Sequence, residues 1–133
     1  MMRDERGALA IWTSIALLAF MITIGLGVDF VGHARAEQEA RAVAAEAARA
    51  GGQQITIASG RAAPVAGSAV AEARRFASAA GYTSSASVTG TRVTVDVEGT
   101  YETSFLGVIG VWELGVAGSG TSDVFSVVDG APR

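Results

Sequence analysis

The feature that most constrains this chain is an uncharged apolar run that extends from Ala8 to Val28. A helix of about 21 residues, rising about 1.5 Å per residue, is roughly 32 Å long, which is close to the thickness of the hydrocarbon core of a bilayer. A helix in a soluble core is normally shorter and keeps a polar face, which this run lacks. The run therefore predicts a membrane helix. A buried core helix and a cleaved secretion signal are the alternatives.

The residues on either side of the run suggest an orientation. Residues 1–7 form a short polar leader that contains Arg3 and Arg6, and basic residues tend to stay on the cytoplasmic side. We therefore expect residues 8–30 to cross the membrane with the N-terminus inside. Asp29 ends the apolar run, and with His33 it is expected to mark the outer membrane boundary. A cleaved signal is disfavoured because its apolar region is usually only about 7–15 residues long.

Residues 31–52 form an alanine-rich segment with strong helix propensity. Glu37 and Arg41 lie four residues apart, a spacing that places opposite charges on one helix face. With Gly51 as the expected C-terminal cap, the sequence predicts one nearly continuous helix from about residue 8 to residue 50. A stripe of small side chains in this segment predicts close packing, either against the chain's own globular part or against helices of other subunits; it includes Ala36, Ala40 and Ala47.

Residues 53–133 predict a small extracytoplasmic module of mixed α and β structure. We expect a loop over residues 53–66, with a short extended piece at 55–57, and then an amphipathic helix over roughly residues 67–80 that Gly81 ends. That helix should bury a face containing Ala69, Ala73, Phe76 and Ala80, with Val70 and Ala77 beside it.

Strand signals follow this helix. Residues 85–89 and 92–101 predict two antiparallel strands joined by a turn at Gly90, and valines at every second position in the second strand predict one buried face. Gly99 is a candidate bulge. The apolar stretch 105–112 predicts a tight turn or short helix that covers the sheet, and residues 113–128 a last strand. The fold class is thus α+β, with a long N-terminal helix, a small helix plus antiparallel strands, and a pilin-like shape.

The composition argues against several kinds of chemistry. There are no cysteines and one histidine, and the net charge is -3, so thiolate chemistry is excluded and a basic nucleic-acid surface is not expected. Asp96 and Glu98 lie on the polar face of a strand, where both carboxylates are solvated, whereas an acid–base pair needs two different environments. Asp29 and His33 make at most two metal ligands. We therefore expect no catalytic, cofactor or metal site and no small-molecule substrate.

The order of segments over residues 5–52 resembles the TadE/TadG-like proteins of the Flp (tight adherence) pilus system, particularly the variants of GC-rich actinobacteria. The resemblance rests on Arg6-Gly7 before the apolar helix, on Gly25-Leu26-Gly27-Val28-Asp29 at its end, and on the Ala/Arg/Glu/Gln-rich helix that follows. It implies a single-pass protein of the cytoplasmic membrane, with its C-terminal module outside and with other pilus or secretion subunits as partners.

The resemblance also implies a candidate processing site. Pilin-like members are cut after a glycine and carry a glutamate at the fifth mature position, and Gly7 followed by Ala8 matches the cut. The fifth residue after Gly7 is Trp12. This departure favours an anchored, minor pseudopilin-like assembly component over a pilin subunit, whereas a processed chain would be able to join an extracellular fibre. The alternative function is a membrane-anchored extracellular binding module, with Trp112 in its contact region.

Overall fold

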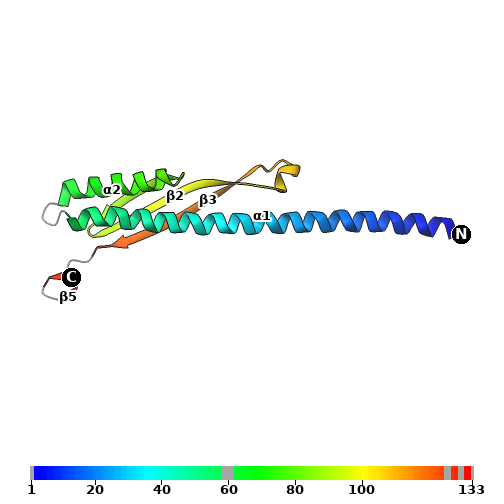
Figure 1. Cartoon of the computed structure of the whole chain (residues 1–133), viewed down its shortest axis with the longest axis horizontal. Helices are drawn as coiled ribbons and strands as arrows, with labels where there is room; N and C mark the ends of the chain where they lie inside the picture. The colour runs from blue at the N-terminus through cyan, green and yellow to red at the C-terminus, as the bar shows by residue number, and fades with distance from the viewer. Residues whose placement is uncertain (1, 58–61, 125–126, 129–130, 133) are drawn as a thin grey trace.

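The computed structural model describes residues 2–57, 62–124, 127–128 and 131–132. A single long helix runs the length of the molecule, and a small helix and a sheet lie along the half of it that is farther from the N-terminus (Figure 1). The fold class predicted from the sequence is confirmed: a long apolar N-terminal helix is followed by a short helix and an antiparallel sheet.

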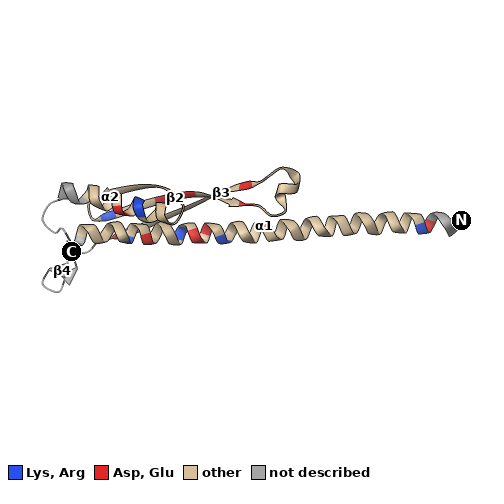
Figure 2. Cartoon of the chain, turned by 45° about the horizontal axis from the view of Figure 1, so that its top comes forward, with Lys and Arg blue, Asp and Glu red and all other residues tan. Residues whose placement is uncertain are grey.

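Helix α1 spans Met2–Ile57 and holds 56 residues, which corresponds to a length of about 84 Å at the α-helical rise. Hydroxyl groups within its apolar run are bonded one turn back; that of Thr23, for example, donates to the carbonyl of Ala19 at 2.8 Å, so these residues do not interrupt the helix. Between Arg6 and Arg35 the helix has one charged residue, Asp29, and Figure 2 shows this stretch of α1 as almost entirely uncharged.

The helix does not end at Gly51, and residues 55–57 are helical rather than extended, so both predictions were wrong. Gly51 and Gly52 are buried inside the helix. A Cβ atom on Gly51 would lie 2.8 Å from the carbonyl oxygen of Ala69 on the second helix. The glycines therefore permit a close crossing of two helices, and tertiary packing overrides the cap preference that the sequence suggested.

Helix α2 spans Ala62–Ala79 and so begins earlier than predicted. Ala69, Ala73 and Ala77 form its buried stripe. Phe76 is 40% exposed and Ala80 is exposed, so the predicted buried face was rotated relative to the real one. Gly81 ends the helix as expected: it adopts a φ of 87°, and the amide of Tyr82 donates to the carbonyl of Ala77.

Three antiparallel strands form a meander in the order β1-β2-β3. Strand β1 spans Thr83–Thr89, β2 spans Arg92–Glu102 and β3 spans Glu113–Asp123. The turn between β1 and β2 lies at Gly90, which has a φ of 61°, as predicted. The ladder between β2 and β3 runs without interruption and pairs Gly99 with Val116, so the predicted bulge is absent.

The last strand ends at Asp123, well before the predicted end at residue 128. Val127–Val128 (β4) pairs instead with Ala131–Pro132 (β5) in a separate two-stranded antiparallel sheet.

The core lies between α1, α2 and one face of the sheet. Val93, Val95 and Val97 of the central strand are fully buried, as the alternation predicted, and each contributes about 1.5–3 kcal/mol of hydrophobic stabilisation. The register places Gly120 beside Val95 and Gly118 beside Val97. Strand β3 therefore presents bare backbone to α1, and the valines of β2 fill the space beside that contact.

The contact between α1 and β3 is close. A Cβ atom on Gly118 would lie 2.6 Å from the carbonyl oxygen of Ala40, and one on Gly120 would lie 2.6 Å from that of Ala44. Both distances are shorter than real Cβ atoms show. Alanines on the helix and glycines on the strand therefore set the separation of the two elements, and larger side chains on either would push them apart.

Candidate functional site

The hairpin tip, residues Thr103–Trp112, is the part of the module nearest the apolar half of α1 (Figure 1). It contains the short 3-10 helix η1, Leu106–Ile109, which ends at Gly110 with a φ of 93°. The amide of Thr103 donates to the carbonyl of Trp112 at 3.0 Å and closes the tip. The prediction of a short helix in this stretch is confirmed, but it caps the end of the β2–β3 hairpin and does not cover the sheet.

Asp29 binds the hairpin tip to α1. Its carboxylate is fully buried and accepts hydrogen bonds from three consecutive backbone amides: Ser104 at 2.7 Å, Phe105 at 2.8 Å and Leu106 at 2.7 Å. Consecutive amides that converge in this way form an anion-binding nest, and hydrogen bonds to a charged acceptor are the stronger kind. The carboxylate is thus satisfied by the chain's own backbone.

Two glycines of α1 make room for aromatic side chains of the hairpin. A Cβ atom on Gly25 would lie 2.8 Å from the ring of Phe105. A Cβ atom on Gly32 would overlap the hydroxyl group of Tyr101. The hairpin therefore rests directly on the helix backbone at both positions, and the contact depends on the absence of side chains there.

His33 lies one turn beyond Asp29 and also contacts the hairpin. Its Nε2 atom lies 2.9 Å from the carbonyl oxygen of Gly115, to which it donates when it carries the proton. Its ring packs edge-on against Tyr101, with 6.3 Å between the ring centroids. Asp29 and His33 share one helix face because they lie four residues apart, and both bind the hairpin. Their predicted role as the membrane boundary stays a prediction.

The surface of the hairpin tip is apolar and exposed. Val108 is 86% exposed, Ile109 74% and Trp112 70%, and Phe105 and Val111 are partly exposed as well. The sequence between Glu102 and Glu113 has no charged residue. Contiguous apolar surface of this kind is uncommon on a soluble module and marks a contact with a partner or a membrane.

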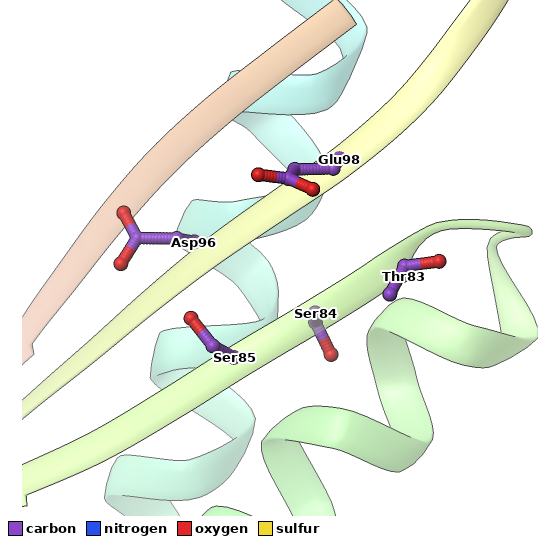
Figure 3. A pocket seen from close by; sticks show the side chains of 5 residues that line it. All are labelled: Thr83, Ser84, Ser85, Asp96 and Glu98. Carbon is purple, nitrogen blue, oxygen red and sulfur yellow. The ribbon is translucent and has the colours of Figure 1, made fainter.

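The exposed face of the sheet carries the other candidate site. A shallow pocket there is lined by Thr83, Ser84, Ser85, Asp96 and Glu98. Asp96 and Glu98 project from β2 toward the same side (Figure 3), and both are exposed. The register pairs Asp96 with Ser85 and Glu98 with Thr83. Among the ion pairs of the residues that the structure describes, none involves either carboxylate.

The remaining predicted site residues fall in two places. Ala40 and Ala47 are fully buried, and with Ala36 they pack against the chain's own core. Of the two kinds of packing predicted for the alanine stripe, the structure shows packing against the chain's own globular part. Gly7 and Ala8 lie exposed in the first turns of α1, and whether the chain is cut between them stays a prediction. Among the residues that the structure describes, no cluster of three or more potential metal ligands occurs.

The residues of α1 that contact the hairpin were not identified from the sequence. Gly25, Asp29 and Gly32 follow one another at spacings of four and three residues, which places them on a single helix face. The alanine stripe continues the same face toward residue 51. A search for small residues at this spacing, begun inside the apolar run, would have indicated that the whole face is a contact surface.

Residues 7–54 match the model of a family described as putative Flp pilus-assembly TadE/G-like. The chain gave no match to a curated protein and none to a solved structure. The matched segment covers most of α1, including the apolar run, Asp29 and the alanine stripe. Over residues 7–54 the chain is therefore similar to the TadE/G-like proteins of Flp pilus assembly.

Proposed function

We propose that the chain is a membrane-anchored structural component of a Flp/Tad-type pilus or a related secretion apparatus. It acts through packing of α1 and its module, without catalysis. The observation that carries the proposal is the bare half of α1: Leu17 is 64% exposed and Phe20 65% exposed, as are the other large apolar side chains around them. A surface of this length and apolarity requires lipid or other apolar helices around it.

The two halves of α1 differ in their contacts, and this difference supports the proposed role. The described structure has one helix long and apolar enough to cross a membrane. Its first half contacts little of the chain, whereas its second half forms the core with α2 and the sheet. In our proposal the N-terminus lies in the cytoplasm, residues 8–30 cross the membrane, and the module lies outside, where it meets other pilus subunits.

A charge in the middle of the apolar run tests this proposal. Leu17→Arg should abolish membrane retention and piliation, because an arginine at the centre of a bilayer costs at least about 2.5 kcal/mol. Ser85→Arg introduces the same charge on the exposed sheet face and is the matched control, which should keep both. Normal piliation with Leu17→Arg would overturn the proposal.

The mature N-terminus decides between two forms of the proposed component. We propose that the leader stays in place, because Trp12 stands where pilin-like members carry glutamate. Intact mass of the protein from native membranes should then correspond to the full chain. A chain that starts at Ala8 would instead identify a processed pseudopilin able to leave the membrane and join a fibre.

The exposed Trp112 favours a second candidate function, a membrane-anchored module that binds an extracellular partner or ligand. Trp112→Ala should then abolish that binding and leave assembly intact. We rank this function second because Trp112 lies at the end of the module nearest the apolar half of α1, which is the least accessible end for a partner that approaches from outside the cell.

A further inference from the structure

We propose that the hairpin tip, residues Thr103–Trp112, is a second membrane contact, which enters the outer headgroup region of the bilayer beside α1. The inference rests on the proposed membrane anchoring of α1. It goes further, because it assigns a lipid-binding role to a loop far along the chain from the apolar run. The occupant is a lipid surface, and it is recognised by apolar contact.

The level of the hairpin tip along α1 is the first argument. Phe105 rests against Gly25, which lies three residues before Val28, the end of the uncharged run. At the α-helical rise this places Phe105 about 4.5 Å inside the end of the run. Apolar side chains at an interface typically reach about 5–10 Å into the boundary between headgroups and acyl chains.

The burial of Asp29 is the second argument. An exposed carboxylate at this level would have to stay hydrated and would oppose entry of the tip into the bilayer. The carboxylate of Asp29 is instead buried and accepts hydrogen bonds from three amides of the tip. On α1, beyond its first turns, the next charged residue after Asp29 is Arg35, which is exposed. The apolar outer surface of the helix therefore continues through Phe30, 77% exposed, and Val31, 54% exposed.

The residues of the hairpin tip are the third argument. Trp112 is 70% exposed, and tryptophan is enriched where a membrane meets water. Phe105, which is 49% exposed, adds apolar surface to the tip. The tip carries no basic residue, so its contact does not depend on anionic lipid. Glu102 and Glu113 face each other at the base of the tip, both exposed, and they limit how deeply it enters because they remain in water.

The hairpin tip is also held in place. Asp29 and His33 bind the hairpin from two successive turns of α1, and Gly25 and Gly32 let it lie against the helix backbone. Its depth is therefore fixed relative to α1. A rigid apolar loop beside an anchored helix adds a second attachment point and restrains the module from swinging about the anchor.

The two tryptophans of the chain permit a direct test. Trp12→Phe leaves Trp112 as the single tryptophan, and Trp112→Phe leaves Trp12, which lies inside the apolar run. Each full-length variant is reconstituted into phosphatidylcholine vesicles whose acyl chains carry bromine either close to the headgroup or close to the terminal methyl group. Bromine quenches tryptophan emission on contact, so the loss of emission reports depth.

We expect bromine close to the headgroup to quench Trp112 strongly, more than bromine close to the terminal methyl group, and addition of salt to leave the quenching unchanged. Quenching of Trp12 without quenching of Trp112 would overturn the inference and leave the anchoring intact. Absence of quenching for both would overturn the anchoring itself.

A second measurement avoids any substitution of Trp112. A spin label on Val108→Cys, a position with few contacts, should be more accessible to oxygen than to an aqueous nickel complex. The same label on Ser119→Cys, on the exposed side of β3, should show the reverse. Equal preference for the aqueous complex at both positions would place the tip in water and overturn the inference.

Discussion

The close contact between α1 and β3 makes a sharp prediction about single methyl groups. Gly120→Ala adds one carbon, which would lie 2.6 Å from the carbonyl oxygen of Ala44, whereas ordinary contact begins at 3.4 Å. The helix and the strand must therefore separate by at least about 0.8 Å, because the backbone nitrogen of Ala45 lies closer still. A gap of that size forfeits roughly a quarter to a half of the dispersion energy of the atoms that it separates.

The cost follows from this geometry. Overpacking of a well-packed core by one methylene costs about 1–3 kcal/mol. In a folding unit of this size, that loss lowers the unfolding temperature by roughly 5–20 °C. Gly118→Ala should act in the same way, because its Cβ atom would lie 2.6 Å from the carbonyl oxygen of Ala40.

Gly115→Ala is the matched control, since it lies on the same strand and its Cβ atom would meet nothing within 4 Å. It should be neutral or stabilising by up to about 1 kcal/mol, because alanine restricts the unfolded chain. The assay is thermal unfolding of the full chain in detergent micelles, followed by near-ultraviolet circular dichroism. Equal stability of Gly120→Ala and Gly115→Ala would refute the account of the helix–strand contact.

Three further predictions concern the other contacts. Asp29→Asn should raise the hydrogen-exchange rates of the three amides that Asp29 binds by about tenfold or more, because the acceptor loses its charge, and unchanged rates would show that the carboxylate does not hold the tip. Gly51→Ala should lower the unfolding temperature because its Cβ atom would strike the carbonyl oxygen of a residue on α2, whereas Gly67→Ala, where the space is open, should raise it; the opposite order would contradict the close helix crossing. The double variant Asp96→Asn, Glu98→Gln should leave piliation unchanged because both carboxylates are solvated, and a loss of pili would give this exposed face a role in assembly.

The parts of the fold that follow from local pattern were predictable. The uncharged run and the alanine-rich segment predicted one long helix, because both properties act through neighbours in the sequence. The alternation of Val93, Val95 and Val97 predicted the buried face of β2 for the same reason. The turn at Gly90 and the helix end at Gly81 were likewise local.

The glycines were harder to interpret, because their meaning depended on residues far away in the chain. Gly51 has the local signature of a helix cap but lies where two helices cross. Gly118 and Gly120 suggest a weakened strand, but they allow β3 to pack closely against α1. A glycine that permits a close approach is identical in sequence to one that permits a turn. Only the partner element distinguishes the two cases.

The role of Asp29 was out of reach for a different reason. Its partners are backbone amides some 75 residues away. Nearly every residue has a backbone amide, so the residue types do not reveal which amides donate. A lone carboxylate after an apolar run suggested a residue at the membrane surface. The structure adds that its charge is bound inside the protein, and this makes the apolar surface around it continuous from α1 to the hairpin tip.

The most direct test of the central claim is the location of the two ends of the fold relative to the membrane. The chain has no cysteine, so single cysteines at Glu5→Cys and Ser119→Cys are clean reporters in intact cells that produce the full chain. A membrane-impermeant maleimide should label Ser119→Cys at once and Glu5→Cys only after the cells are permeabilised. Labelling of both positions in intact cells, or of Glu5→Cys alone, would contradict a single-pass protein that carries its module outside.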